Sequence, residues 1–271
     1  MAKSPAILMP FVAHRVFGHT PVRIESTWGL RDLQPGMAYT LCNSLQCQYC
    51  GALFLDYRFS DKEMAALYAD YRGEEYTQLR KHYEPGYADY HASYASRASY
   101  LDSVDVFLRP HLPAHPVILD WGGGSGINTP LRHSAEQVYV HDISECALLE
   151  GVLRADPKFS VQQSYDLIVC SQVLEHVAWP TQVVQELVSL MQKDALLYLE
   201  VPYEGLMRMQ PTSRMLHATK HHWHEHINFF TADALLEMVA QAGLAVVAFQ
   251  EVDIALGWRD SCIFSMLCRR K

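Results

Sequence analysis

The chain has 271 residues, with 22 Lys and Arg against 30 Asp and Glu, which gives a formal net charge of −8. This balance disfavours a general binder of nucleic acid, because such binding depends on Lys and Arg that neutralise phosphates. Hydrophobic residues make up 49% of the chain and charged residues 19%, which suits a folded core and excludes a disordered chain.

The N-terminal segment, residues 1–60, shows no clear helical periodicity and holds three clustered cysteines, Cys42, Cys47 and Cys50. The longest apolar run near its start, Ala6 to Ala13, is broken by Pro10, so we expect neither a membrane span nor a signal peptide, and we expect a cytoplasmic protein. The cysteine spacing does not indicate a disulfide framework. We therefore predict a small irregular or β-rich module over residues 1–60.

A helical region follows over residues 61–112. From Asp61 the apolar and aromatic positions recur every three or four residues, which predicts an amphipathic helix. A second helix is predicted over 87–108, and Pro110 is the first of three prolines that end it. We expect these helices to link the first module to the rest of the chain.

From residue 113 to 271, short apolar runs alternate with helical patterns. Strands are predicted at 117–121, 138–142, 167–170 and 196–201, and helices near 127–133, 144–152 and 181–192. This alternation predicts a parallel sheet with helices on both faces. A helix over 232–242 then precedes two strands, 245–252 and 262–268, with no helix between them, so the last strand must return antiparallel.

The first predicted strand ends in a glycine-rich turn, Asp120-Trp-Gly-Gly-Gly-Ser-Gly126. Such a turn lets the backbone approach a ligand closely. The next strand ends at Asp142, and a carboxylate at this position is placed to accept hydrogen bonds from two ribose hydroxyls. The dinucleotide pattern G-x-G-x-x-G fails, because Ile127 occupies the third glycine position. The sequence therefore predicts a nucleoside site of another kind.

The spacing Asp-x-Gly-x-Gly-x-Gly resembles the first motif of class I S-adenosylmethionine-dependent methyltransferases, and Val173-Leu-Glu-His176 resembles a later segment of that family. The resemblance implies a Rossmann-like α/β fold with a seven-stranded sheet whose last strand is antiparallel, and S-adenosylmethionine (SAM) as the cofactor. By position it implies the following cofactor contacts: Asp120, Gly122, Gly124, Gly126, Asp142 and Gln172.

A histidine-rich segment follows the strand at 196–201 and reads His217-Ala-Thr-Lys-His-His-Trp-His-Glu-His226. Its His spacing does not match a metal site, whereas His and Glu near the cofactor suit acid–base chemistry. The part from Glu225 onward resembles the "EHxxxF" loop of methyltransferases that act at carbon on nucleotide-linked deoxysugars. That resemblance implies His226, Glu225 and His176 as catalytic residues. Either His226 or His176 is expected to act as the general base, and Glu225 is expected to orient it.

The same family carries an N-terminal zinc-binding module with "CxxCG", which Cys47-Gln-Tyr-Cys50-Gly51 resembles. A tetrahedral zinc site needs four ligands, and no first cysteine pair precedes this one, so Cys42 or upstream histidines must contribute. The cysteines are thus either ligands of a structural zinc or small buried apolar groups.

The acceptor is predicted to be a small sugar-type molecule, methylated at carbon or oxygen. His222 and His224 are predicted substrate contacts, and Tyr90 and Tyr94 are either substrate contacts or part of a packing face. Two alternatives stay open: an O-methyltransferase acting on a non-sugar metabolite, and a cofactor-binding protein without catalysis. A polar acceptor site favours the sugar, and an apolar tunnel favours the alternative metabolite.

Overall fold

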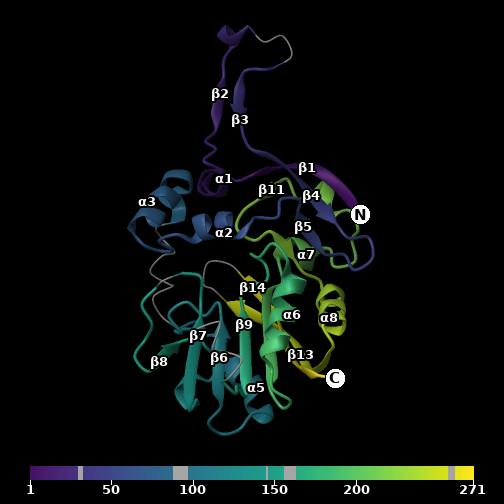
Figure 1. Cartoon of the computed structure of the whole chain (residues 1–271). Coiled ribbons are helices and arrows are strands. Elements are labelled where there is room, and N and C mark those ends of the chain that lie inside the picture. Colours follow the sequence, from purple (N-terminus) through teal and green to yellow (C-terminus); the bar gives the residue numbers. More distant parts are fainter. Residues whose placement is uncertain (30–32, 88–96, 145, 156–162, 256–259) are drawn as a thin grey trace.

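The structure is a computed structural model that describes residues 1–29, 33–87, 97–144, 146–155, 163–255 and 260–271. Two β-sheets lie one above the other, and a short hairpin, β2 with β3, projects from the upper one (Figure 1). The strands are β1 (Ala2–Leu8), β2 (Val22–Ile24), β3 (Gly36–Ala38), β4 (Leu41–Gln46), β5 (Leu53–Leu55), β6 (Val117–Trp121), β7 (Gln137–His141), β8 (Val152–Arg154), β9 (Leu167–Ser171), β10 (Leu196–Pro202), β11 (His222–Trp223), β12 (Asn228–Phe229), β13 (Leu244–Ala255) and β14 (Asp260–Arg270).

The α-helices are α1 (Pro10–Phe17), α2 (Asp61–Tyr68), α3 (Glu74–Tyr83), α5 (Leu101–Leu108), α6 (Pro180–Leu190), α7 (Gly205–Met209) and α8 (Ala232–Gln241). Single 3₁₀ turns are η1 (Ser26–Trp28), η2 (Pro85–Tyr87), η4 (Arg109–His111), η5 (Arg132–Ser134) and η6 (Leu216–Ala218). None of the described helices is long and apolar enough to cross a membrane.

The larger sheet has seven strands in the order β13-β14-β10-β9-β6-β7-β8. The five strands from β10 to β8 run parallel, and β14 lies antiparallel between β10 and β13. The predicted Rossmann-like sheet with an antiparallel last strand is therefore confirmed. The carboxyl ends of β6, β7, β9 and β10 meet at one edge, which faces the smaller sheet (Figure 1).

Helices cover both faces of this sheet, as the alternation of strands and helices predicts. On one face, α6 and α8 pack against alternate residues of the central strands, such as Ile168 and Leu197. On the other face, α5 packs against the intervening residues, such as Leu167 and Val169. Because both faces are buried, the central strands are almost continuously apolar.

Two predicted helices are wrong. No helix forms in the described part of 144–152, and the segment near 127–133 contains only the start of the 3₁₀ turn η5. After Asp142, the backbone N–H and the hydroxyl of Ser144 both donate to the Asp142 carboxylate, a local bond that competes with helix formation. Of the helix predicted over 87–108, the described residues form α5 alone, and 88–96 lie outside the described chain.

The smaller sheet has five strands in the order β11-β1-β4-β5-β12. Its two outer strands come from residues 222–229, which leave the larger sheet after β10 and return to it at α8. The sheet therefore extends beyond the predicted boundary at residue 60. Its core buries Trp223 and Phe229 together with Leu8, Phe11 and Leu53.

Local sequence explains the helices beside the smaller sheet. Ser60 and Glu63 form a reciprocal capping box that starts α2, with the Glu63 carboxylate 2.7 Å from the Ser60 N–H. Helix α1, which the sequence analysis did not predict, begins at Pro10 and ends at Gly18 with a φ of 71°.

Candidate active site

The glycine-rich turn leaves β6 at the edge where the parallel strands end. Gly122, Gly124 and Gly126 have φ angles of 83°, 57° and 83°, in the left-handed region that favours glycine. A Cβ at Gly122 would lie 2.3 Å from Cγ2 of Val173, so this position also lacks room for a side chain. The turn thus brings bare backbone to the surface at the position predicted for the cofactor.

The two predicted carboxylates flank this turn. Asp120 is buried, and its carboxylate accepts a hydrogen bond of 2.5 Å from the Thr129 hydroxyl; burial raises the pKa of Asp120 to about 7. Asp142 accepts a hydrogen bond of 2.8 Å from the Gly124 N–H. Asp142 therefore lies against the turn at the end of β7, where a carboxylate that binds ribose is expected in this fold.

Gln172 follows β9 with a φ of 57°, a conformation uncommon for residues other than glycine. Its side-chain amide donates to the Glu200 carboxylate at 3.1 Å. Glu200, which the sequence analysis did not single out, is fully buried in β10 and also accepts from Tyr100, Ser171 and Tyr198 at 2.6–2.8 Å. The sequence does mark this residue, because Glu200 is the one charged residue in the apolar run LLYLEVP.

These residues fit SAM. At Gly122 a Cβ would collide with Val173, so the backbone there stays bare, and Gln172 and the carboxylate of Asp142 lie at the same edge of the sheet. The structure thus brings together five residues predicted to contact the cofactor, Gly122, Gly124, Gly126, Asp142 and Gln172, and buries Asp120 behind the turn.

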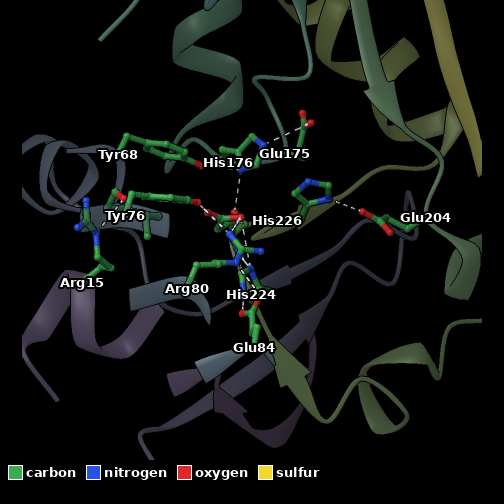
Figure 2. Close-up of polar contacts among 12 residues, drawn as sticks. Arg15, Tyr68, Tyr76, Arg80, Glu84, Glu175, His176, Glu204, His224 and His226 are labelled. Atoms are coloured by element: carbon green, nitrogen blue, oxygen red, sulfur yellow. Dashed lines mark hydrogen bonds and ion pairs between the residues drawn. The ribbon is translucent and has the colours of Figure 1, made fainter. Parts of the chain in front are cut away.

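On the acceptor side, His176 and His226 lie next to one another, with ring centroids 4.7 Å apart (Figure 2). Nδ1 of His176 lies 2.7 Å from the Tyr68 hydroxyl and 3.1 Å from the backbone carbonyl of Glu225. Burial, together with the nearby charge of His226, lowers the pKa of His176 to about 3. His176 is therefore a neutral imidazole at physiological pH.

The carboxylate that pairs with His226 belongs to Glu204, whose Oε1 lies 2.6 Å from Nδ1 of His226. Burial opposes the charged imidazolium, but this hydrogen bond and the carboxylate of Glu175 outweigh it and raise the pKa of His226. The sequence analysis assigned the orienting role to Glu225. That assignment is wrong for the side chain, because the Glu225 carboxylate is bonded elsewhere.

Glu225 instead joins α3 to the histidine-rich segment. Its carboxylate accepts from the Tyr76 hydroxyl at 2.5 Å and from the Arg80 guanidinium at 2.8 Å. Although burial favours the neutral acid, His224 and Arg80 hold the pKa of Glu225 well below its usual range. Arg80 also donates to Glu84, which in turn bonds to His224 (Figure 2).

The predicted substrate residues have different outcomes. His224 belongs to the cluster with Glu84 and stacks on Phe11. His222 is exposed in β11, at the outer edge of the smaller sheet, and does not join the cluster. Tyr90 and Tyr94 lie outside the described residues.

The three predicted metal-binding cysteines do not come together. Cys47 and Cys50 share a tight turn, in which the Gly51 N–H donates to the Cys47 carbonyl at 3.0 Å and Gly51 has a φ of 81°. Cys42 is buried in β4, where burial raises the pKa of its thiol to about 12. In the described part of the chain, no group of three possible ligands within 4.8 Å of one another includes any of these cysteines, so the predicted set is not gathered into one site there.

Comparison with solved structures finds similar folds. A 1,6-didemethyltoxoflavin-N1-methyltransferase from Burkholderia thailandensis, solved with bound 1,6-didemethyltoxoflavin and S-adenosylhomocysteine, is 16% identical, with a TM-score of 0.52 over 81% of this chain and 96% of that one. A SAM-dependent methyltransferase from Mesorhizobium loti is 17% identical, with a TM-score of 0.43 over 63% of this chain and 100% of that one. No curated protein sequence matches the chain.

The sequence profile of a methyltransferase domain family matches residues 91–248. This range spans β6, β7, β9 and β10 and includes the glycine-rich turn, Asp142, Gln172 and the acceptor-side histidines. The chain therefore belongs to the methyltransferase domain family and is a class I SAM-dependent methyltransferase.

Proposed function

We propose that the chain transfers the methyl group of SAM to a small sugar-type acceptor, at carbon or at oxygen, bound beside His176 and His226. The observation that carries the proposal is a polar cluster near the carboxyl ends of β9 and β10 (Figure 2). Its members are tyrosines, histidines, carboxylates and one arginine: Tyr68, Tyr76, Arg80, Glu84, Glu175, His176, Glu204, His224, Glu225 and His226. The resemblance of the His-Glu-His segment to sugar C-methyltransferases agrees with it. SAM supplies an already activated methyl group, so the protein's task is to align the acceptor and remove its proton.

His226 is the residue best suited to remove that proton. Nδ1 faces Glu204 at 2.6 Å, so an N–H at this position donates to the carboxylate and leaves the lone pair of Nε2 for the acceptor proton. The carboxylate stabilises the imidazolium that forms. His226 acts at oxygen by taking a hydroxyl proton and at carbon by taking a proton next to a carbonyl.

His176 and the α3 residues position the acceptor. His176 stays neutral, so it contributes hydrogen bonds and no charge. Arg80 is already paired with Glu225 and Glu84, and carboxylates outnumber guanidinium groups in the cluster. The cluster therefore suits uncharged hydroxyl and carbonyl groups, and any phosphate of a nucleotide-linked acceptor would bind outside it.

The test is a screen of nucleotide-sugars, free glycans and flat non-sugar metabolites with methyl-labelled SAM, followed by NMR to locate the label. We expect the label to appear on a sugar. The variant His226→Asn should lose at least about 100-fold in kcat, whereas its dissociation constant for SAM, measured by calorimetry, should not change. His221→Asn is the matched control, because His221 is exposed in the same segment. Label found on non-sugar metabolites alone would refute the sugar acceptor, and full turnover by His226→Asn would refute the base.

A further inference from the structure

We propose that Glu175, His176 and His226 form a binding site for a divalent transition-metal ion of the Zn²⁺, Fe²⁺ or Co²⁺ type. Each residue offers one ligand atom, and these atoms all lie within 4.8 Å of one another. The site joins Glu175 and His176, which follow β9, to a histidine fifty positions further along the chain. For this reason the spacing within the histidine-rich segment alone gave no metal signal.

The Glu175 carboxylate is the first argument for a ligand. Its side chain is 1% exposed, and neither carboxylate oxygen has a hydrogen-bond partner. A buried carboxylate without a partner is costly unless a cation or a proton compensates it. Oε1 lies 3.6 Å from Nε2 of His176, beyond hydrogen-bond distance and close to the separation of two ligands on one metal ion.

The two imidazoles provide the second argument, because each has an acceptor on its Nδ1 side. His226 faces the Glu204 carboxylate at 2.6 Å, and His176 faces the backbone carbonyl of Glu225 at 3.1 Å. The carbonyl only accepts, and the Tyr68 hydroxyl 2.7 Å from the same Nδ1 can accept as well, so a proton on Nδ1 fits both contacts and leaves Nε2 of His176 with a lone pair. A histidine that binds a metal through one ring nitrogen characteristically donates the N–H of its other ring nitrogen to a carboxylate or a backbone carbonyl. That acceptor orients the ring.

The donor set selects the class of cation. Two imidazole nitrogens and one carboxylate oxygen suit zinc, iron or cobalt, whereas calcium and magnesium prefer sites made of oxygen. Bonds of about 2.0–2.2 Å require the ligand atoms to approach to roughly 3–3.5 Å. The side chains of His176 and His226 are 20% and 36% exposed, so one side of the site stays open to water or to an acceptor oxygen.

Metal and proton compete for the same atom. A cation on Nε2 of His226 occupies the lone pair that the proposed function assigns to the acceptor proton, so the metal-free chain is the form in which His226 acts as the base. The metal-site inference shares its residues with the proposed function, and it depends on that function in no other way. Metal binding is measured without SAM or acceptor, so its failure and the failure of methyl transfer to a sugar are separate results.

The experiment titrates Co²⁺ into the chelator-treated chain of 271 residues and follows the visible absorption of the ion, with Zn²⁺ as the competitor. We expect one Co²⁺ per chain, a spectrum of nitrogen and oxygen ligands without sulfur charge transfer, and displacement by Zn²⁺. Glu175→Gln and His226→Asn should each weaken binding by more than about tenfold. Glu204→Gln, which removes no ligand, should weaken it by about 10-fold or more because it loosens the His226 ring.

Two controls separate this site from other metal-binding groups. The double variant Cys47→Ser/Cys50→Ser removes the two thiols of one turn, and His221→Asn removes an exposed histidine of the same segment as His226; both should keep the wild-type spectrum and affinity. Circular dichroism confirms that each variant is folded. The proposal is overturned if the wild-type chain binds no Co²⁺ at millimolar concentration, if the cysteine variant loses binding, or if folded Glu204→Gln and His226→Asn both bind as wild type does.

Discussion

At the scale of single residues, Gly122 combines a left-handed backbone with a lack of space. Replacing it with alanine costs about 1–2 kcal/mol for the backbone, and the close approach to Val173 adds about 1–3 kcal/mol. We expect Gly122→Ala to lower the free energy of unfolding by this sum and to weaken SAM binding in calorimetry. Gly243→Ala is the matched control: Gly243 has a φ of 77° but no atom within 4 Å of its Cβ position. Equal effects of the two variants would contradict the steric argument.

Also at the residue scale, the proposed base predicts a pH profile. The pKa of His226 is raised, so kcat/KM should fall as the pH decreases through a value above about 6.5, the ordinary pKa of histidine. Asp120 and Glu175 have pKa values of about 7 and titrate in the same range. Glu204→Gln tests whether His226 is the group that titrates. Loss of the carboxylate lowers the pKa of His226, so the fall in kcat/KM on the acidic side of the profile should move to lower pH. The exposed Glu136→Gln should leave the profile unchanged, and an unchanged profile in Glu204→Gln would rule out His226 as the titrating base.

At the scale of elements, α3 is held to the histidine-rich segment by an ion pair that is little exposed. Glu225→Gln removes one of the two carboxylates paired with Arg80 and leaves Glu84 as the other, so the loss should not exceed the cost of breaking a buried pair, about 3–5 kcal/mol. Asp253→Asn breaks the more exposed pair with Arg208 and should cost less than about 1 kcal/mol. Urea unfolding at pH 7 would measure the free-energy change of each variant.

The sign of the pH dependence follows from the lowered pKa of Glu225. Its stabilising contribution is complete above the unfolded value of about 4.3 and is lost as the pH falls through the folded value. Wild type and Glu225→Gln should therefore converge in stability at strongly acidic pH. A difference that stays constant down to pH 2 would show that the ion pair is not its cause.

The same scale shows which parts of the structure follow from sequence and which do not. Strands β6, β9 and β10 were predicted because continuous apolar runs mark buried parallel strands, and the turn after β6 has its own glycine spacing. The pairing of His226 with Glu204 was not predictable, because it depends on how a long loop folds back. The two-residue strands β11 and β12 likewise exist only through pairing with β1 and β5, and no periodicity can appear in two residues.

At the scale of the whole molecule, residues 222–229 join the two sheets. Asn228 lies in β12, and its amide donates to the carbonyls of Leu174 and Val177 after β9 at 3.0 and 2.8 Å. Its side-chain oxygen accepts from Arg58 at 2.8 Å. The segment that carries the proposed base is therefore fixed to both sheets at once, so the placement of His226 depends on the smaller sheet as well as on the methyltransferase fold.

This connection predicts that the two sheets unfold together. Trp223 is fully buried in the smaller sheet, where its indole N–H donates to Ser44 at 2.8 Å, and Trp223→Ala should cost about 3–5 kcal/mol. If the sheets are coupled, the loss of stability should lower the protection from hydrogen exchange in the amides of β9 and β10 as well as in those of β1 and β4. Trp28→Ala, at a half-exposed tryptophan of the turn η1 between β2 and β3, is the control and should change neither set. Loss of protection confined to β1 and β4 would instead mean that the smaller sheet unfolds as a separate domain, with the boundary that the sequence predicted near residue 60.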